Sequence, residues 1–291
     1  MERRSFLAAL PLLLSGCMPK SSGLTVGSKN FTEQLVLGEL LAQYLAHATP
    51  LPIDRRFYLA GTYICHQALL AGRIDMYVEY TGTALVAILK EKPISDHAAV
   101  FNIVKDLYSR RFGLEVFPSL GFDNTFAMVM RGNDARRLRL KTLSDAAAVS
   151  SQLRLGVGYE FLERPDGYKG LAAKYNLKFA EAPRVMDLGL LYRALQNNQV
   201  DIVAGANTDG LIAALDLVVL DDDRHYFPPY DAVPIVRRAT LERHPEVTTA
   251  LQKLSGPITA EDMRRMNYAV DGQKKDAALV VKDFLARNPS L

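Results

Sequence analysis

Cysteine is scarce in this chain, because only Cys17 and Cys65 occur among its 291 residues. Cys17 lies in an N-terminal segment with the features of an export signal, so no intrachain disulfide is expected in the remainder. A phosphate-binding glycine-rich loop of the P-loop type is also missing, which argues against an ATPase. No long apolar run follows Cys17, which argues against a membrane permease.

The chain also lacks a strong excess of charge, since its formal net charge is only +3. The densest basic run, from Arg131 to Lys141, has no aromatic residues beside it. Such a run is typical of a solvated surface, so a nucleic-acid partner is not expected. With 49% hydrophobic and 23% charged residues, the chain matches an ordinary globular protein, and its length leaves room for two α/β lobes.

The N-terminus resembles a bacterial lipoprotein signal. Arg3 and Arg4 precede an apolar run, Phe6 to Leu14, that is too short to span a bilayer. The Leu-Ser-Gly sequence before Cys17 resembles the lipobox, in which the cysteine is acylated and becomes the first residue of the mature protein. We therefore predict a signal peptide over residues 1–17, with both general and twin-arginine export left open.

A polar stretch, residues 18–23, follows the predicted acylation site and is expected to act as a tether. One acylated cysteine would hold the protein at a membrane surface with its body in water. The expected location is therefore that of an anchored lipoprotein facing the periplasm or the cell exterior.

From Leu24 onward, short apolar runs alternate with amphipathic stretches, which predicts an α/β fold with mostly parallel sheets. Asn30 and Glu33 have the spacing of a capping box at the start of the first helix. The strands predicted from these runs are Leu24–Gly27, Arg56–Leu59, Ile74–Tyr80, Leu153–Val157 and Val200–Ala204. The predicted helices cover Thr62–Ala71, Thr83–Leu89, a segment starting near Pro165, Asp187–Gln196 and much of Leu241–Leu291.

The pattern repeats faintly within the chain. Ala68-Leu69 precede Asp75 at the same spacing as Ala194-Leu195 precede Asp201, which suggests two lobes built on one plan. We predict that residues 24–122 and 231–291 form one lobe and residues 123–230 the other. The chain would then cross between lobes twice, near Leu120–Phe126 and near Tyr226–Asp231.

Ligands of open α/β sheets bind beyond the carboxyl ends of strands, often against helix starts. Lys29, Tyr80, Thr83 and the turn Asn207-Thr208-Asp209 fall at such positions, and Phe126 and Tyr230 fall near the two crossings. A crevice with aromatic rings and a few cations suits a zwitterion that carries a quaternary ammonium group. Aromatic faces attract such a cation, which has no N–H to donate, while Lys29 or Arg164 would pair with its carboxylate.

Eight motifs extend this interpretation to a known family. The sequence resembles substrate-binding proteins of the glycine betaine/carnitine/choline ABC importers in the order of GSKNFTEQ, IDMYVEYTGT, LGFDNTFAM, RPDGYKGL, MDLGLLYRAL, NTDG, LDDDRHYFPPY and MNYAVD. The resemblance implies a two-lobed type II periplasmic-binding fold that closes on its ligand and delivers it to a permease driven by a separate ATPase. It also implies that Tyr80 and Tyr230 belong to an aromatic cage, with Lys29, Thr83 and Arg164 near the polar end of the ligand.

Two positions depart from the family pattern. Phe126 stands where relatives commonly have tyrosine, and Gly205-Ala206 stand where relatives often carry an aromatic residue. Tyr63, Tyr77 or Tyr159 could replace the aromatic side chain that is absent at Gly205-Ala206. Alternatively, its absence could make room for a larger betaine such as ergothioneine. A ligand-sensing domain of the same fold is the other alternative.

Each candidate residue has a structural alternative. Tyr80 and Tyr230 could be core tyrosines, Lys29 a surface lysine and Thr83 a helix cap, and Arg164 could form a surface ion pair.

Catalysis and metal binding are not expected. Cys65 and His66 are adjacent on a predicted helix and therefore point apart, which disfavours a nucleophile–base pair. Asp221 to Asp223 with His225 suit a solvated turn better than a metal site. We expect no enzymatic activity, no cofactor and no bound metal.

Overall fold

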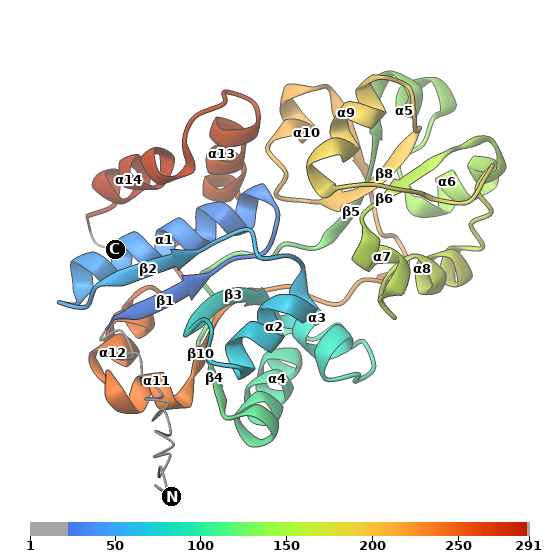
Figure 1. Ribbon diagram of the computed structural model, residues 1–291. Coiled ribbons are helices and arrows are strands. Elements are labelled where there is room, and N and C mark those ends of the chain that lie inside the picture. The colour runs from blue at the N-terminus through green and yellow to red at the C-terminus, as the bar shows by residue number, and fades with distance from the viewer. Residues whose placement is uncertain (1–22, 290–291) are drawn as a thin grey trace, which may run out of the picture.

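The computed structural model describes residues 23–289 and divides them between two lobes, each built around a five-stranded sheet (Figure 1). The predicted signal peptide, Cys17 and residues 18–22 lie outside the described residues. Among the residues described, no helix combines the length and the apolar character needed to cross a membrane.

The first sheet has the strand order β2-β1-β3-β10-β4. Strand β1 pairs in parallel with β2 and β3, whereas β10 pairs antiparallel with β3 and β4. The strands of this sheet are β1 Leu24–Gly27, β2 Ile53–Arg56, β3 Met76–Tyr80, β4 Leu114–Val116 and β10 Ala232–Arg237.

The second sheet repeats this plan with the order β7-β6-β8-β5-β9. Strand β6 pairs in parallel with β7 and β8, and β5 pairs antiparallel with β8 and β9. Its strands are β5 Phe126–Arg131, β6 Leu155–Val157, β7 Arg184–Val185, β8 Ile202–Ala206 and β9 Leu217–Leu220. In each sheet four of the five strands therefore run in the same direction, as predicted for mostly parallel sheets, and the fifth strand, β10 or β5, enters directly after a crossing and runs opposite to them.

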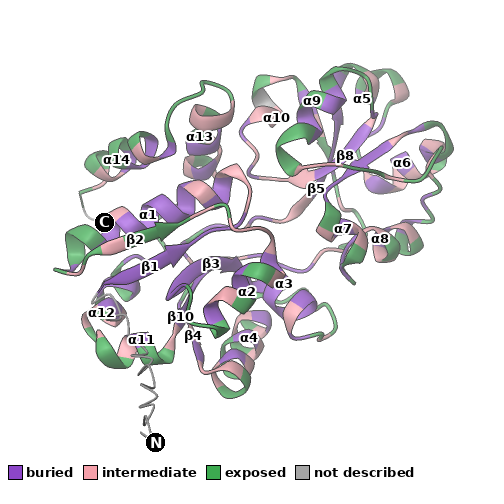
Figure 2. Cartoon of the chain, in the orientation of Figure 1, coloured by how far each residue is buried: buried purple, intermediate pink, exposed green. Residues whose placement is uncertain are grey.

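Helices cover both faces of each sheet, and separate apolar clusters fill the space between (Figure 2). The first lobe contains α1 Thr32–Ala48, α2 Thr62–Leu70, α3 Thr81–Thr83, a π-helical turn Ala84–Ile88, α4 His97–Phe112, α11 Arg238–Arg243, α12 Glu246–Lys253, α13 Ala260–Asp271 and α14 Ala277–Arg287. The second lobe contains α5 Gly132–Leu138, α6 Leu143–Val149, α7 Tyr159–Glu163, α8 Tyr168–Tyr175, α9 Leu191–Gln196 and α10 Leu211–Ala214, with short 3₁₀ turns at Ser150–Gln152 and Leu188–Leu190.

The internal repeat seen in the sequence has a structural basis. Asp75 accepts a hydrogen bond from the Thr25 N–H at 2.9 Å, and Asp201 accepts one from the Arg154 N–H at the same distance. In both lobes the aspartate thus ties the helix-to-strand turn to the neighbouring strand. The repeated Ala-Leu…Asp spacing marks equivalent turns of two similar lobes.

Two crossing segments join the lobes, and Asp123 and Asp231 pair in an antiparallel bridge where the segments run side by side. Strand β5 of the second sheet begins at Phe126, and β10 of the first sheet begins at Ala232. The C-terminal helices return to the first lobe, where α13 and α14 pack on α1 (Figure 1). The prediction of helices over the C-terminal part is therefore confirmed.

Three local predictions were wrong. Strand β2 ends at Arg56 instead of starting there, since Tyr58 has a left-handed backbone (φ 58°) that an extended strand does not allow. Helix α1 begins at Thr32 with Phe31 at its N-cap, and no side chain caps it. Helix α8 begins at Tyr168 rather than near Pro165, because the short helix α7 and a turn come first.

Candidate functional site

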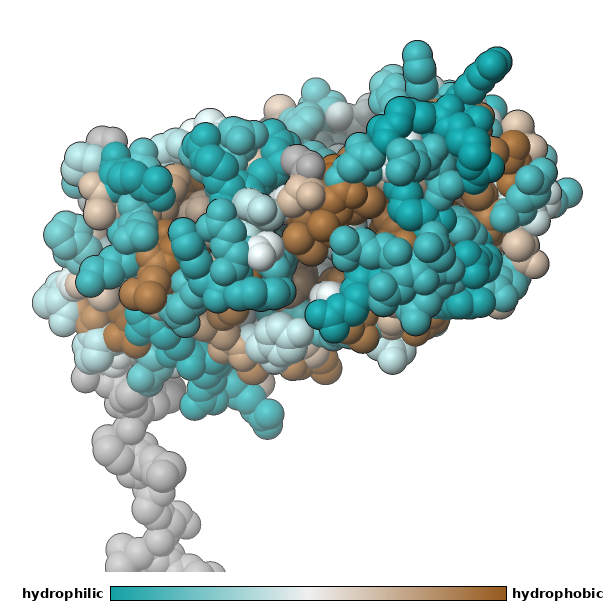
Figure 3. All heavy atoms as spheres, turned by 90° about the horizontal axis from the view of Figure 1, so that it is seen from above, coloured by the Kyte–Doolittle hydropathy of each residue, from teal (hydrophilic) through white to brown (hydrophobic). Residues whose placement is uncertain are grey.

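A cleft of about 710 Å³ lies between the lobes and is lined by residues of both. Seen from above, apolar side chains gather at the boundary between the lobes (Figure 3). The lining includes six of the eight predicted site residues: Lys29, Tyr80, Thr83, Phe126, Arg164 and Tyr230. These residues come from distant parts of the sequence, and the strand ends and crossings bring them together.

Lys29 is buried rather than exposed, so the structural alternative of a surface lysine does not hold. It follows β1, and its ammonium forms a salt bridge with the fully buried carboxylate of Glu79. The same ammonium donates to Thr62 Oγ1 at 2.9 Å and lies 4.9 Å from the centroid of the Tyr80 ring. An ammonium has three donors, so one N–H of Lys29 is left for a ligand.

Arg164 is also buried, and its ion pair is not a surface pair. The guanidinium donates from Nε and Nη2 to the two oxygens of Asp166, at 2.9 and 2.5 Å. Its Nη1 donates to Thr83 Oγ1 at 3.0 Å, which links the second lobe to the first. Burial lowers the pKa of Arg164, but the adjacent carboxylate of Asp166 outweighs that effect and raises it.

The structural alternative for Thr83, a helix cap, does not hold. Helix α3 begins two residues earlier, and Tyr80 occupies the N-cap position. This leaves the Thr83 hydroxyl free to accept the bond from Arg164 across the two lobes.

Phe126 and Tyr230 form an aromatic group on the crossing segments. Their ring centroids are 5.5 Å apart in an edge-to-face arrangement, and Phe161 lies 5.0 Å from Phe126. The Arg164 guanidinium carbon lies 5.1 Å from the Phe126 ring centroid and 5.9 Å from that of Tyr230. The Tyr230 hydroxyl donates to Asp166 Oδ2 at 2.6 Å, so the tyrosine, the aspartate and the arginine hold one another in place.

Tyr80 is fixed by its hydroxyl, which donates to Glu33 Oε1 at 2.7 Å. Glu33 is the residue predicted to complete a capping box. Its buried carboxylate instead accepts hydrogen bonds from the side chains of Tyr80, Asn124 and Asn267. Three side-chain donors in a buried site outweigh one backbone N–H at a helix start.

Asn207 and Thr208 are not among the residues that line the cleft, although both lie in the turn after β8. Their neighbour Asp209 does line it, and its carboxylate accepts from the Ala206 N–H at 2.9 Å and from the Tyr192 hydroxyl. Burial raises the pKa of Asp209 to about 6, even though both hydrogen bonds favour its ionised form. The turn thus contributes its third residue to the cleft rather than its first two.

The wall position at Gly205-Ala206 is next to Tyr192. A Cβ added at Gly205 would lie 2.2 Å from the Tyr192 hydroxyl oxygen, so the tyrosine from α9 occupies the space beside the glycine. Sequence reasoning missed Tyr192, although the quoted motif MDLGLLYRAL contains it.

The three tyrosines considered as a replacement wall have different positions. Of them, Tyr159 lines the cleft, whereas Tyr77 is a core residue that donates to Glu79 at 3.0 Å. Tyr63 lies under the ammonium of Lys90, 5.3 Å from its ring centroid, and is not a lining residue.

The two other groups considered in the sequence, Cys65 with His66 and Asp221 to Asp223 with His225, have structural surroundings. Burial raises the pKa of Cys65 to about 12, which keeps its thiol protonated. His66 packs edge-on against Tyr108 and Phe112 in the core of the first lobe. Asp222 accepts hydrogen bonds from the backbone of Tyr226 and Phe227 and shapes a turn.

Another polar group lies where the lobes join. A ring nitrogen of His97 and one carboxylate oxygen each of Asp123 and Asp231 lie within 4.8 Å of one another. His97 Nδ1 lies 2.8 Å from Asp231 Oδ2, and Asp123 accepts from the Tyr230 N–H at 2.6 Å. These interactions hold the two crossing segments to the start of α4.

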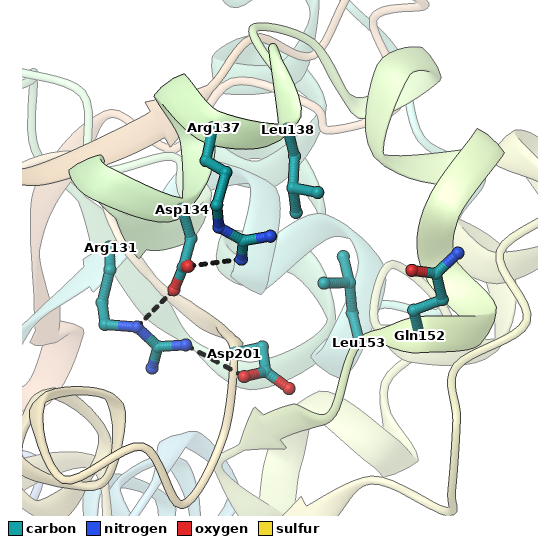
Figure 4. Close-up of a pocket in the computed structure, with 7 residues that line it drawn as sticks. All are labelled: Arg131, Asp134, Arg137, Leu138, Gln152, Leu153 and Asp201. Carbon is teal, nitrogen blue, oxygen red and sulfur yellow. Dashed lines mark hydrogen bonds and ion pairs between the residues drawn. The ribbon is translucent and has the colours of Figure 1, made fainter.

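A small pocket of about 110 Å³ lies at the far end of the second sheet (Figure 4). Arg131 spans it, donating to Asp134 at 2.5 Å and to Asp201 at 2.9 Å. Its Nη1 also donates to the carbonyls of Leu195 and Val200. Four of the five N–H donors of Arg131 are thus used within the second lobe, and the pocket lies outside the cleft.

Comparisons with known proteins agree with this geometry. Residues 22–287 match the family model described as the substrate-binding domain of an ABC-type glycine betaine transport system. The chain is 36% identical over 285 residues to the carnitine transport binding protein OpuCC of Listeria monocytogenes, covering 95% of this chain and 92% of that protein. A crystal structure of a glycine betaine/carnitine/choline ABC transporter superposes with a TM-score of 0.76 at 34% identity, covering 92% of this chain and 99% of the other.

A third relative has a different name. The chain is 37% identical over 265 residues to the ergothioneine transport permease/ergothioneine binding protein EgtU of Helicobacter pylori. The match covers 91% of this chain but only 47% of that protein. From the family match and the two full-length likenesses, the chain belongs to the family of substrate-binding domains of ABC-type glycine betaine transport systems, and it is a solute-binding receptor rather than an enzyme.

Proposed function

We propose that the cleft binds a quaternary ammonium compound, such as glycine betaine, choline or carnitine, and that the two lobes close on it. The observation that carries this proposal is the aromatic lining: Tyr80, Phe126, Tyr192 and Tyr230 all border one cleft. Aromatic faces attract a permanent cation by roughly 0.5–2 kcal/mol each, and the attraction is largest where water is excluded.

The charge balance of the cleft supports a cationic ligand. Its lining holds five acidic side chains (Glu33, Glu160, Asp187, Asp209 and Asp271) and four basic ones (Lys29, Arg164, Arg193 and Lys274). Two of these cations, Lys29 and Arg164, are already paired with Glu79 and Asp166 behind the lining. The field left for a ligand is therefore negative.

The carboxylate of a zwitterion has a narrower choice of partners than the sequence suggested. Hydrogen bonds to Glu79 and Thr62 occupy two of the three donors of Lys29, and bonds to Asp166 and Thr83 occupy three of the five donors of Arg164. The remaining N–H groups of these two residues are the partners we propose for the polar end of the ligand. Asn207 and Thr208 are not part of this proposal, because neither lines the cleft.

A larger betaine such as ergothioneine is the second candidate. The cleft volume of about 710 Å³ lies in the range that holds drug-sized ligands, and β8 carries no aromatic side chain at Gly205-Ala206. The 37% identity to a protein named as an ergothioneine binding protein also favours it.

Calorimetric titration with choline, glycine betaine, carnitine, proline betaine and ergothioneine tests the proposal and separates the two candidates. The neutral carbon isostere of choline is the control for charge, and it should bind at least tenfold more weakly than choline. If no compound of the panel binds, the proposed ligand class is wrong. If the isostere binds as well as choline, cation–π attraction is not the basis of recognition.

The role of Tyr80 has its own test. Tyr80→Leu should weaken binding of the best ligand by more than about 1 kcal/mol. Tyr63→Leu is the matched control, because Tyr63 lies outside the cleft lining and should leave affinity unchanged. If Tyr80→Leu and Tyr63→Leu bind the ligand with equal affinity, Tyr80 has only a structural role.

We further propose that the mature protein starts at an acylated Cys17, after export and cleavage of the signal sequence between Gly16 and Cys17. It would pass its ligand to an ABC permease with its ATPase. The lobe limits 24–122 with 231–291, and 123–230, are part of this proposal. Membrane fractionation of wild-type and Cys17→Ala protein tests the anchor, because the variant should leave the membrane fraction.

A further inference from the structure

The motif MNYAVD contributes Asp271 to the cleft lining, and it also places a buried polar residue, Asn267, where α13 of the first lobe meets the turn after β8 of the second, a contact called the seam below. Asn267, which is 2% exposed, lies in α13 of the first lobe. Its Nδ2 donates to Glu33 Oε2 at 2.9 Å and to the carbonyl oxygen of Thr208 at 3.0 Å. Thr208 belongs to the turn after β8 of the second lobe, so one amide group joins both lobes.

The first of these two bonds leads directly into the cleft. Glu33 uses its other oxygen to accept from the hydroxyl of Tyr80 at 2.7 Å and from the side chain of Asn124. Asn124 lies on the first crossing segment and is 3.3 Å from the same hydroxyl. A continuous set of buried hydrogen bonds therefore runs from the Thr208 main chain through Asn267 and Glu33 to the ring of Tyr80.

The seam around Asn267 has the features of a contact that forms and breaks. Asn207 Oδ1, Thr208 Oγ1 and Asn267 Oδ1 are buried there without a protein partner. Such atoms are costly while the seam is shut, and opening the seam would hydrate them. Backbones also meet closely, because a Cβ added at Gly210 would lie 2.3 Å from the Tyr268 nitrogen. Helices α10 and α13 face each other at this point (Figure 1).

We propose that Asn267 is a positioning residue that couples closure of the lobes to the orientation of Tyr80. With the seam shut, Asn267 holds Glu33 in the position from which it fixes the Tyr80 hydroxyl. With the seam open, the bond to Thr208 is lost and the amide is released to solvent. The part of this proposal that concerns ligand affinity rests on the proposed function of Tyr80; the part that concerns closure does not.

The experiment measures closure and binding separately. Spin labels on cysteines introduced by Ala173→Cys in α8 and Leu279→Cys in α14 report the distance between lobes, since both sites are exposed and native Cys65 is buried. The distance is measured in ligand-free protein and again with choline, and the choline dissociation rate is measured by stopped flow. Asn267→Leu is the test variant, because it keeps the approximate volume and removes the donor.

Asn288→Leu is the matched control. Asn288 Nδ2 donates to the Phe284 carbonyl at 2.8 Å within the first lobe, so this variant removes one amide hydrogen bond without touching the seam. Gly210→Ala is a second test from the opposite lobe, because its added methyl group would meet the backbone of Tyr268. It keeps the proposal falsifiable if Asn267→Leu fails to fold.

Asn267→Leu and Gly210→Ala should both shift the ligand-free distance distribution toward the longer, open value, whereas Asn288→Leu should not. Choline should dissociate on the order of tenfold faster from Asn267→Leu than from the control. An unchanged distance distribution in both test variants would overturn the proposal. If choline fails to bind the wild type, the proposed ligand is wrong, and the distance measurement still decides whether Asn267 controls closure.

Discussion

Asp166 provides the sharpest test of how the cleft is held together. Its side chain is fully buried, and it pairs through both oxygens with Arg164, whose side chain is 4% exposed. It also accepts from the Tyr230 hydroxyl at 2.6 Å. Asp166→Asn keeps the shape of the side chain but leaves the guanidinium as a buried charge without a counter-ion.

The expected loss follows from these contacts. Removing one member of a buried ion pair costs about 3–5 kcal/mol, because the remaining charge loses its compensation while it stays desolvated. In a chain of this size, each kcal/mol shifts the melting temperature by about 2–4 °C. We therefore expect the melting temperature of Asp166→Asn to fall by roughly 10 °C, as measured by circular dichroism at neutral pH.

An exposed pair supplies the control. Asp106 and Arg110 form an i,i+4 salt bridge on α4, with side chains 52% and 68% exposed. Asp106→Asn should lower the melting temperature by no more than about 3 °C, since solvent screens such pairs. The reasoning is refuted if the two variants melt at the same temperature. A double variant, Arg164→Met with Asp166→Leu, should recover much of the lost stability, because it removes both buried charges.

Three other perturbations address single groups. Asp209, with a pKa raised to about 6 by burial, should make choline bind on the order of tenfold more tightly at pH 7 than at pH 5, and Asp209→Asn should remove that dependence. The raised pKa means that the folded state binds the proton of Asp209 more tightly than the unfolded state does. Loss of that proton therefore lowers the free energy of unfolding as the pH rises through about 6. Burial lowers the pKa of His66, so its neutral form stabilises the fold above the unfolded pKa of about 6.5 and that stabilisation is lost as the pH falls. His66→Phe should flatten the acid side of the stability profile, and an unchanged profile would assign the acid sensitivity to other groups. Glu79→Gln leaves the Lys29 ammonium buried without its partner and should lower the urea midpoint, while an unchanged midpoint would mean that the Lys29–Glu79 pair does not stabilise the fold.

The alternation of short strands and amphipathic helices was sufficient to predict the α/β class and the position of most elements. The repeated Ala-Leu…Asp spacing was also informative, because the turn it encodes is local and both lobes use it. The local pattern failed at Arg56–Leu59. A strand was predicted there from apolar residues, but the left-handed backbone of Tyr58 ends the extended segment and cannot be read from residue type alone.

The candidate site was predictable in its residues more than in its contacts. Lys29, Tyr80 and Arg164 could be chosen because strand ends and family motifs mark them. The hydrogen-bond partners of these residues could not be predicted. Glu79 faces Lys29 only through tertiary packing, and Thr83 meets Arg164 only across the two lobes. Tyr192 was missed for the same reason, because its hydrogen bond to Asp209 joins α9 to the turn after β8.

The pairing of the cleft cations affects how such a receptor discriminates between anionic, cationic and zwitterionic ligands. If Lys29 and Arg164 were unpaired, any small anion would be attracted to the cleft. With Glu79 and Asp166 behind them, each cation is neutralised, and only a ligand placed to reach the remaining N–H groups gains from them. The acidic lining and the aromatic faces then attract a quaternary ammonium group, which has no N–H to donate. Water solvates such a group less tightly than it solvates a primary ammonium. Recognition of the cation would supply affinity, and recognition of the carboxylate would distinguish a zwitterion from a simple cation. A cleft built this way should bind choline and its betaine with affinities that differ mainly through the free donors of Arg164, and Arg164→Lys should narrow that difference.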